Sequence, residues 1–162
     1  MASGDTLVFT PLANEPPAVQ AATADERNGH AVLDFGKAAN QSAVFSAVLP
    51  SSYAGRGLTV RLHYAMTAAA VGAVDWDVAF ERIGRRRQSL DEDGFGPVAS
   101  ADGNPVPPQA GLVDCVRLAL ADGDQIDNLA AGEAFRVRVT RDSQNDTASG
   151  DAELLFVVIE ES

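Results

Sequence analysis

The sequence is short of several residue types on which common functions depend. It holds one cysteine, Cys115, two histidines, His30 and His63, and 12 Lys and Arg against 23 Asp and Glu, for a formal net charge of −11. A lone cysteine excludes a disulfide within the chain, and these three residues are too few for an ordinary zinc site. Nucleic-acid binding relies on clustered basic residues that release counterions, so the acidic balance argues against a nucleic-acid partner.

Long apolar segments are also missing. No stretch approaches the roughly 20 apolar residues of a membrane helix, and the opening MASGDTLVFTP lacks the basic and apolar regions of a secretory signal. We therefore expect no membrane partner and synthesis in a cytoplasm. With 162 residues, 46% of them hydrophobic, the chain is long enough to bury one core, which predicts a single folded domain.

What the sequence does contain is a series of short alternating segments. The longest covers residues 58–84 and reads LTVRLHYAMTAAAVGAVDWDVAFERIG. Apolar residues fill every second position on both sides of a small-residue turn, and a period of two is typical of strands with one buried face. The pattern predicts a central pair of strands, with Trp76 in the core and Asp75 and Asp77 on the outer face.

Further alternating segments, bounded by Gly, Pro, Asn or Asp, occur at residues 31–35, 43–49, 112–121, 135–140 and 152–160. About eight antiparallel strands with frequent turn signals predict an all-β fold, a jelly-roll β-sandwich over residues 30–162. An immunoglobulin-like sandwich is the alternative. The irregular residues 85–111 form a connection that is unusually long for a compact domain, so we expect a short strand within residues 95–101.

Residues 1–29 differ from the rest because three prolines interrupt them. Proline fixes φ and removes an amide donor, which favours an extended N-terminal arm over a helix or a central strand. Docking on another surface is predicted for the apolar patch of the arm, formed by Leu7, Val8 and Phe9. The alternative interpretation makes this patch the first edge strand of the domain itself.

The last segment, residues 152–160, is apolar on both faces. An antiparallel strand usually turns one face to water, so a second apolar face requires cover from another layer or from another subunit. We therefore expect a subunit interface on the face formed by Leu155, Val157 and Ile159.

No catalytic pattern stands out, because neither histidine accompanies a nucleophile motif, and we predict neither an enzyme nor a cofactor. Two acidic loops offer oxygen atoms to calcium without EF-hand spacing, and turn formation accounts for them more simply, so no metal site is predicted. Their carboxylates are Asp122, Asp124 and Asp127 in one loop and Asp142, Asp146 and Asp151 in the other. The basic triplet at residues 85–87 is expected to pair with the acidic triplet at residues 91–93 or with a neighbouring subunit.

Three stretches resemble small jelly-roll structural proteins of tailed bacteriophages, namely residues 57–84, AAGEAFRVRVTRDSQNDTASGDA (130–152) and ELLFVVIEES (153–162). The resemblance is to capsid decoration (cement) proteins and to the heads of phage fibres. It implies a homotrimer on the outside of the phage head, with the major capsid protein as partner, that stabilises the shell by binding only its assembled form. The implied location is the virion, assembled in the host cytoplasm.

The alternative from the same resemblance is a receptor- or glycan-binding module of a phage fibre or tail. Aromatic or acidic loop residues would make the contacts in that case. The candidates are Tyr53, Asp91 and Asp93.

Overall fold

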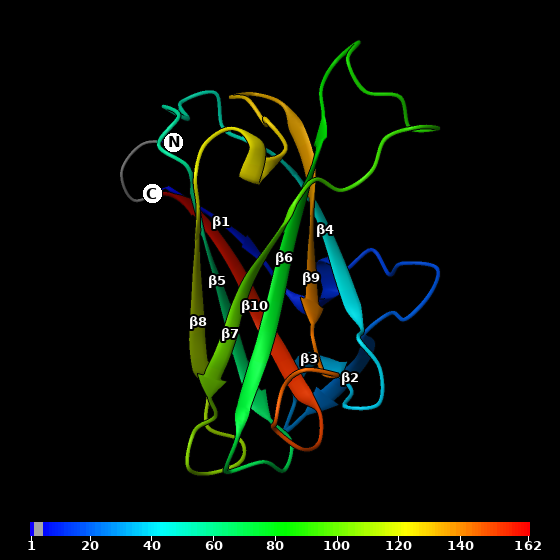
Figure 1. Ribbon diagram of the computed structural model, residues 1–162, viewed down its shortest axis with the longest axis vertical. Helices are drawn as coiled ribbons and strands as arrows, with labels where there is room; N and C mark the ends of the chain where they lie inside the picture. Colours follow the sequence, from blue (N-terminus) through cyan, green and yellow to red (C-terminus); the bar gives the residue numbers. More distant parts are fainter. Residues whose placement is uncertain (2–4) are drawn as a thin grey trace.

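The computed structural model describes residue 1 and residues 5–162. Within this part of the chain, ten strands form two antiparallel sheets that pack face to face (Figure 1). The all-β prediction is therefore confirmed, with more strands than expected because two lie in the proline-containing N-terminal segment. None of the helical turns in the described residues is long or apolar enough to cross a membrane.

Sheet A has the spatial order β2-β3-β10-β5-β8. In addition, β1 pairs with residues 157–160 of β10. Its strands are β1 (Thr6–Phe9), β2 (Thr23–Arg27), β3 (His30–Phe35), β5 (Leu58–Met66), β8 (Asp114–Leu120) and β10 (Ala152–Glu161). Sheet B has the order β4-β9-β6-β7. Its strands are β4 (Ser42–Val48), β6 (Ala73–Ile83), β7 (Val98–Pro105) and β9 (Ala134–Arg141). Two 3-10 turns complete the elements, η1 (Pro11–Ala13) and η2 (Asp124–Ile126).

The two long central strands form as predicted, but they do not pair with each other. β5 lies in sheet A between β10 and β8, and β6 lies in sheet B between β9 and β7. The short connection between them crosses from one sheet to the other (Figure 1). A period of two specifies which side chains are buried, and a hairpin and a face-to-face arrangement bury the same set, so the sequence pattern does not distinguish them.

Aromatic side chains fill the space between the sheets. Trp76 of β6 is fully buried, as predicted, and makes edge contacts with Phe35 of β3 at 5.2 Å and with Tyr64 of β5 at 5.6 Å between ring centroids. Edge-to-face pairs of this kind contribute beyond the area they bury. These three rings join the two sheets across the core.

The N-terminal segment belongs to the sandwich and is not a separate arm. β1 pairs antiparallel with residues 157–160 of β10, in the stretch that β3 leaves open because it pairs only with residues 152–154. Phe9 is buried against Phe45, with ring centroids 5.5 Å apart, while Val8 is 55% exposed. The interpretation of the apolar patch as an edge strand is therefore confirmed, because the patch pairs with the part of β10 that β3 does not reach.

Between β1 and β2 the chain crosses to sheet B and covers the outer edge of β4. Asn14 accepts a hydrogen bond from the Val44 amide through its side chain, and the Glu15 amide donates to the Val44 carbonyl. The Ala22 amide likewise donates to the carbonyl of Ser42. An open edge strand invites pairing with other chains, and this cover removes the hazard. Residues 2–4, also part of the predicted arm, lie outside the described residues.

β10 contains an irregularity that changes which side chains are buried. Its pairing with β5 shifts between Leu154 and Phe156, as in a β-bulge. A bulge inserts one extra residue and reverses the faces beyond it. Leu154, Val157 and Ile159 are therefore all buried in the core of their own chain, and Phe156 turns outward with 44% exposure. The predicted interface formed by Leu155, Val157 and Ile159 is wrong as a shared face, since two of the three pack inside the sandwich.

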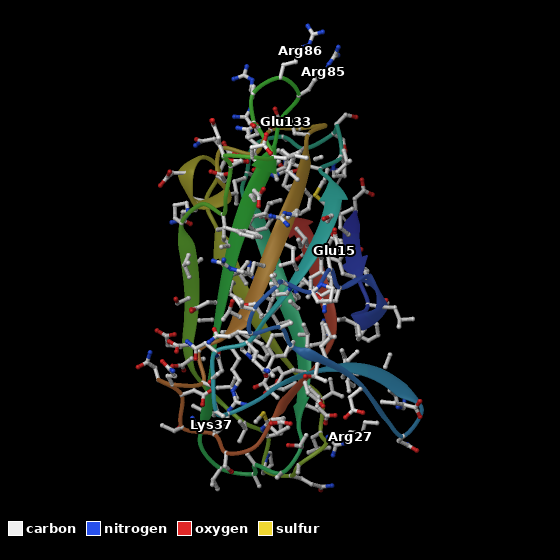
Figure 2. All side chains as sticks on the ribbon, turned by 90° about the vertical axis from the view of Figure 1, so that its right-hand side faces the viewer. Glu15, Arg27, Lys37, Arg85, Arg86 and Glu133 are labelled. Carbon is white, nitrogen blue, oxygen red and sulfur yellow. The ribbon has the colours of Figure 1, made fainter. Side chains whose placement is uncertain are left out.

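The irregular connection before β7 projects beyond sheet B, with Arg85 and Arg86 at its tip (Figure 2). No ion pair forms in the described residues between this basic triplet and the acidic residues 91–93, so the first of the two expected pairings is wrong, and pairing with a neighbouring subunit stays a prediction. Phe95, farther along, anchors the connection on sheet B by packing beneath the guanidinium groups of Arg136 and Arg138. The strand expected at 95–101 begins slightly later, at Val98.

Candidate binding site

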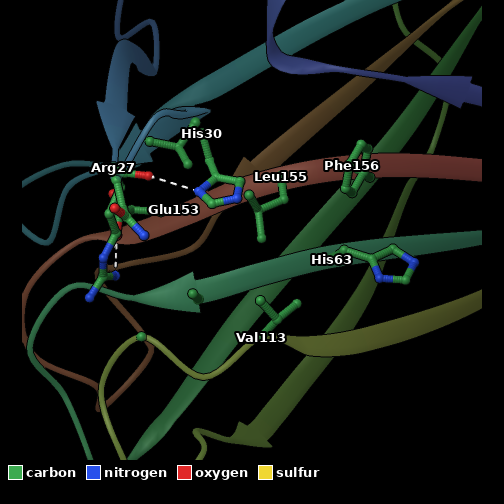
Figure 3. A pocket seen from close by; sticks show the side chains of 11 residues that line it. Arg27, His30, His63, Val113, Glu153, Leu155 and Phe156 are labelled. Atoms are coloured by element: carbon green, nitrogen blue, oxygen red, sulfur yellow. Dashed lines mark hydrogen bonds and ion pairs between the residues drawn. The ribbon is translucent and has the colours of Figure 1, made fainter.

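A hollow of about 390 Å³ opens on the outer face of sheet A (Figure 3). β5 and β10 form its floor, the β2–β3 hairpin forms one wall, and the segment before β8 forms the other. The hairpin turns tightly because Asn28 and Gly29 both adopt positive φ, of 48° and 79°, which suits a two-residue turn between twisted strands. We call this hollow the sheet A groove.

The floor of the sheet A groove is apolar and contains an exposed aromatic ring. Val32, Ala65 and Leu155 line it, and Phe156 lies beside the imidazole of His63 in an edge contact of 6.2 Å between ring centroids. The bulge in β10 is the local cause, because it turns Phe156 away from the core. An apolar surface with a partly exposed ring is suited to a ligand that has an apolar face of its own.

Polar groups line one side of the sheet A groove. The Arg27 Nη1 atom donates to Glu153 Oε1 at 2.5 Å and to the Met66 carbonyl at 3.1 Å. The His30 Nδ1 atom lies 3.1 Å from the carbonyl oxygen of Arg27, so this nitrogen carries the proton and donates (Figure 3). In a neutral imidazole the Nε2 atom is then left as an acceptor. The rim thus offers both donors and acceptors, while its one cation and one anion neutralise each other.

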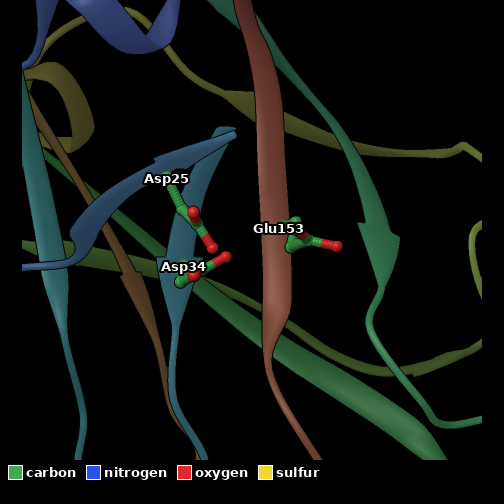
Figure 4. A group of neighbouring side chains, drawn as sticks. All are labelled: Asp25, Asp34 and Glu153. Atoms are coloured by element: carbon green, nitrogen blue, oxygen red, sulfur yellow. The ribbon is translucent and has the colours of Figure 1, made fainter. Parts of the chain in front are cut away.

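Three carboxylates lie next to this wall, those of Asp25, Asp34 and Glu153, and their oxygens approach within 4.8 Å of one another. Figure 4 shows Asp25 and Asp34 pointing toward each other and Glu153 pointing away from them. The Glu153 carboxylate instead accepts from Arg27. Burial and the neighbouring Asp25 carboxyl together raise the pKa of Asp34 to about 7. Because Glu153 is committed to an arginine, the other two carboxyls share a proton more readily than they would hold a metal ion.

Four of the six carboxylates of the two acidic loops, those of Asp122, Asp127, Asp142 and Asp146, accept hydrogen bonds from donors of the protein. Asp122 accepts from the Tyr53 hydroxyl at 2.7 Å, and Asp127 accepts from the Arg82 amide at 2.9 Å. Asp146 is fully engaged by Arg141 and Lys37. These four carboxylates therefore stabilise loops, in agreement with the simpler interpretation of the sequence.

The residues predicted to make contacts do not converge on the sheet A groove. Leu155 alone lines it, whereas Leu7 and Phe9 pack toward the core. Tyr53 is buried at the opposite end of the sandwich, and Asp91 and Asp93 are exposed on the projecting connection. The outward position of His63 was visible in the alternation of its strand. The outward position of Phe156 was not, because nothing in the apolar run 154–159 marks the bulge.

No family model and no curated protein matches the chain. Solved structures do. A family 35 carbohydrate-binding module from an environmental isolate matches with a TM-score of 0.57 at 15% identity, covering 96% of this chain and 97% of that one. The xylan-binding module CBM15 matches with a TM-score of 0.52 at 8% identity, covering 96% and 95%. The CBM35 of Cellvibrio japonicus Abf62 matches with a TM-score of 0.50 at 11% identity, covering 98% of each chain. At such low identities these matches show the fold, a jelly-roll sandwich, as predicted.

Proposed function

We propose that the protein is a non-catalytic carbohydrate-binding module that holds a glycan in the sheet A groove. The observation that carries the proposal is the exposed ring of Phe156 on an apolar floor, beside a rim of hydrogen-bonding groups. The similarity in fold to carbohydrate-binding modules supports it. A sandwich fold hosts many functions, so the groove and not the fold is the basis of the assignment.

The chemistry of the groove matches the two sides of a sugar ring. A pyranose has a C–H face that packs on apolar and aromatic surfaces, and a periphery of hydroxyls that both donate and accept hydrogen bonds. Phe156 and Leu155 provide the first kind of surface. Arg27, His30 and Glu153 provide the second. Small-molecule sites are usually apolar hollows into which a few polar groups point.

The electrostatics favour a neutral glycan. Arg27 and Glu153 are paired with each other within the lining, and the whole molecule carries a net charge of −11. A polysaccharide rich in carboxylate or sulfate groups would be repelled on approach. We therefore propose neutral polysaccharides as the ligand class.

Affinity electrophoresis against soluble xylan, galactan, mannan and β-glucan tests the proposal. We expect at least one of these polymers to retard the protein and Phe156→Ala to lose most of the retardation. The matched control is Val48→Ala, which shortens a side chain of similar exposure on sheet B, 57% against 44%. Equal retardation of Phe156→Ala and the intact protein, or no retardation by any neutral polymer, would refute the proposal.

The same proposal includes a glycan-binding module of a phage fibre or tail. Capsid decoration, with a homotrimer and the major capsid protein as partner, stays a prediction from the sequence resemblance. Two of the sequence features that favoured it are explained within the chain, because Leu7 and Phe9 pack on their own core and Val157 and Ile159 of β10 are buried inside the sandwich. Sedimentation at micromolar concentration tests the trimer, and occupancy on expanded phage heads tests the decoration role.

A further inference from the structure

The outer face of sheet B carries a second hollow, of about 210 Å³, on the side of the sandwich opposite the sheet A groove. One row across the sheet is entirely polar, because Ser42, Thr140, Asp77 and Ser100 stand at paired positions on its four strands. The next row contributes Arg138, between Val44 and Ala79. Gln20 and Asn40 close the side next to β4.

The two charged groups of this hollow are not paired with each other. Asp77 and Arg138 occupy diagonal positions on neighbouring strands, a separation that a long side chain can span. No hydrogen bond or ion pair of the Arg138 guanidinium occurs in the described residues, where its contact is with the Phe95 ring at 4.5 Å. The neighbouring Arg136 provides the contrast, since it binds Glu81 through two nitrogens at 2.5 and 3.1 Å. The contact with Phe95 thus positions the Arg138 guanidinium and leaves its N–H groups free to donate hydrogen bonds to a ligand.

The hydroxyl groups of the hollow leave further capacity unused. Ser42 Oγ and Thr140 Oγ1 lie 2.7 Å apart, and this contact uses one of their two protons. Asp77 accepts from Ser100 Oγ at 2.6 Å through one oxygen, while its other oxygen has no hydrogen bond in the described residues. Burial raises the pKa of Asp77, as expected for a carboxylate that has lost part of its hydration.

We infer that this hollow is a second carbohydrate subsite, in which Arg138 and Asp77 bind vicinal hydroxyls of one sugar ring. A guanidinium only donates and an ionised carboxylate only accepts, whereas each hydroxyl does both. Two adjacent hydroxyls can therefore accept from Arg138 and donate to Asp77 together. A simple anion or cation would satisfy one group and be repelled by the other. The choice of ligand class rests on the proposed function, but the residues are independent of the sheet A groove.

Titration of the ¹⁵N-labelled protein with methyl glycosides of glucose, galactose, mannose and xylose tests the inference. We expect saturable amide shifts at Asp77, Thr140 and Ser100 with at least one glycoside. Asp77→Asn and Arg138→Leu should each raise the dissociation constant obtained from these shifts at least tenfold. Arg117→Leu, which removes an arginine from the outer face of sheet A, should titrate like the intact protein. Tetrahydropyran-2-methanol, which has the ring without vicinal hydroxyls, should produce no such shifts.

Phe95 is a positioning residue in this account, and its variants separate positioning from folding. Phe95→Leu should release Arg138 toward Asp77 and abolish the shifts although both charged groups remain. Phe95→Tyr keeps the ring beneath the guanidinium and should restore them. Unchanged titration of Asp77→Asn and Arg138→Leu, or shifts confined to the sheet A groove, would overturn the inference. Phe156→Ala must keep the sheet B shifts, so failure of the proposed function and failure of this inference give different results.

Discussion

Asp34 gives the protein a stability that depends on pH. Burial and the neighbouring Asp25 raise its pKa to about 7 from a usual value of 3.8. Between about pH 4 and pH 7 the folded state therefore binds more protons than the unfolded state, and the free energy of unfolding falls as pH rises through this window. Because Asp34 is partly exposed, water screens the effect, and we expect a total loss of about 1–2 kcal/mol.

Asp34→Asn removes the titrating group and tests this point. Urea denaturation at pH 4.5 and pH 8 should show the variant gaining about 1–2 kcal/mol relative to the intact protein at the higher pH. The comparison at two pH values cancels any change in packing. A difference that is the same at both pH values would contradict the raised pKa.

Arg141 is a fully buried charge, so its guanidinium needs a hydrogen-bond partner for every donor. Its guanidinium donates to both Asp146 oxygens, at 2.7 and 3.2 Å, and to three carbonyls, those of Phe35, Ala148 and Gly150. All five donors are thereby used. The pair fixes the loop between β9 and β10 against β3.

Arg141→Met leaves the buried Asp146 carboxylate with Lys37 as its one cationic partner among the described residues. Removing one partner of a buried pair costs about 3–5 kcal/mol, so we expect a loss of that size in chemical denaturation. Arg61→Met is the control, since it breaks a half-exposed pair with Glu160 and should cost at most about 1 kcal/mol. Equal losses for the two variants would show that burial does not determine the cost.

At the scale of single elements, β1 is a structural strand of the sandwich. Phe9 is 7% exposed and packs against Phe45, so Phe9→Ala should destabilise the protein by about 3–5 kcal/mol. Val8→Ala, at a position 55% exposed on the same strand, should change stability by less than about 0.5 kcal/mol. Thermal unfolding of both variants measures this. A fully stable Phe9→Ala would restore the interpretation of residues 1–29 as a separate arm.

The alternating segments predicted most strands because burial on one face leaves a local trace. β5, β6, β8 and β9 lie close to where the pattern put them. Strand partners were not predictable in the same way, since β5 and β6 bury identical residues whether they pair or face each other. The site was harder still. Phe156 reaches the surface through a bulge inside a run of apolar residues, where a shift of one residue leaves no compositional mark.

At the scale of the whole molecule, the sandwich presents two outer sheet faces of different character. The sheet A groove is apolar with a polar rim, and the sheet B hollow is polar with an arginine held open by Phe95. Two sites on opposite faces of one rigid body cannot both contact the same short oligosaccharide. A protein with both sites would therefore cross-link long polysaccharide chains, which increases apparent affinity through multivalency.

A crystal structure of the protein with an oligosaccharide cut from the polysaccharide that retains it would test the central claim most directly. We expect a sugar ring packed on Phe156, between the β2–β3 hairpin and the segment before β8, with hydroxyls bonded to the Arg27–Glu153 side. Sugar bound instead at the loop end near Tyr53 and Asp122, with the sheet A groove empty, would contradict it.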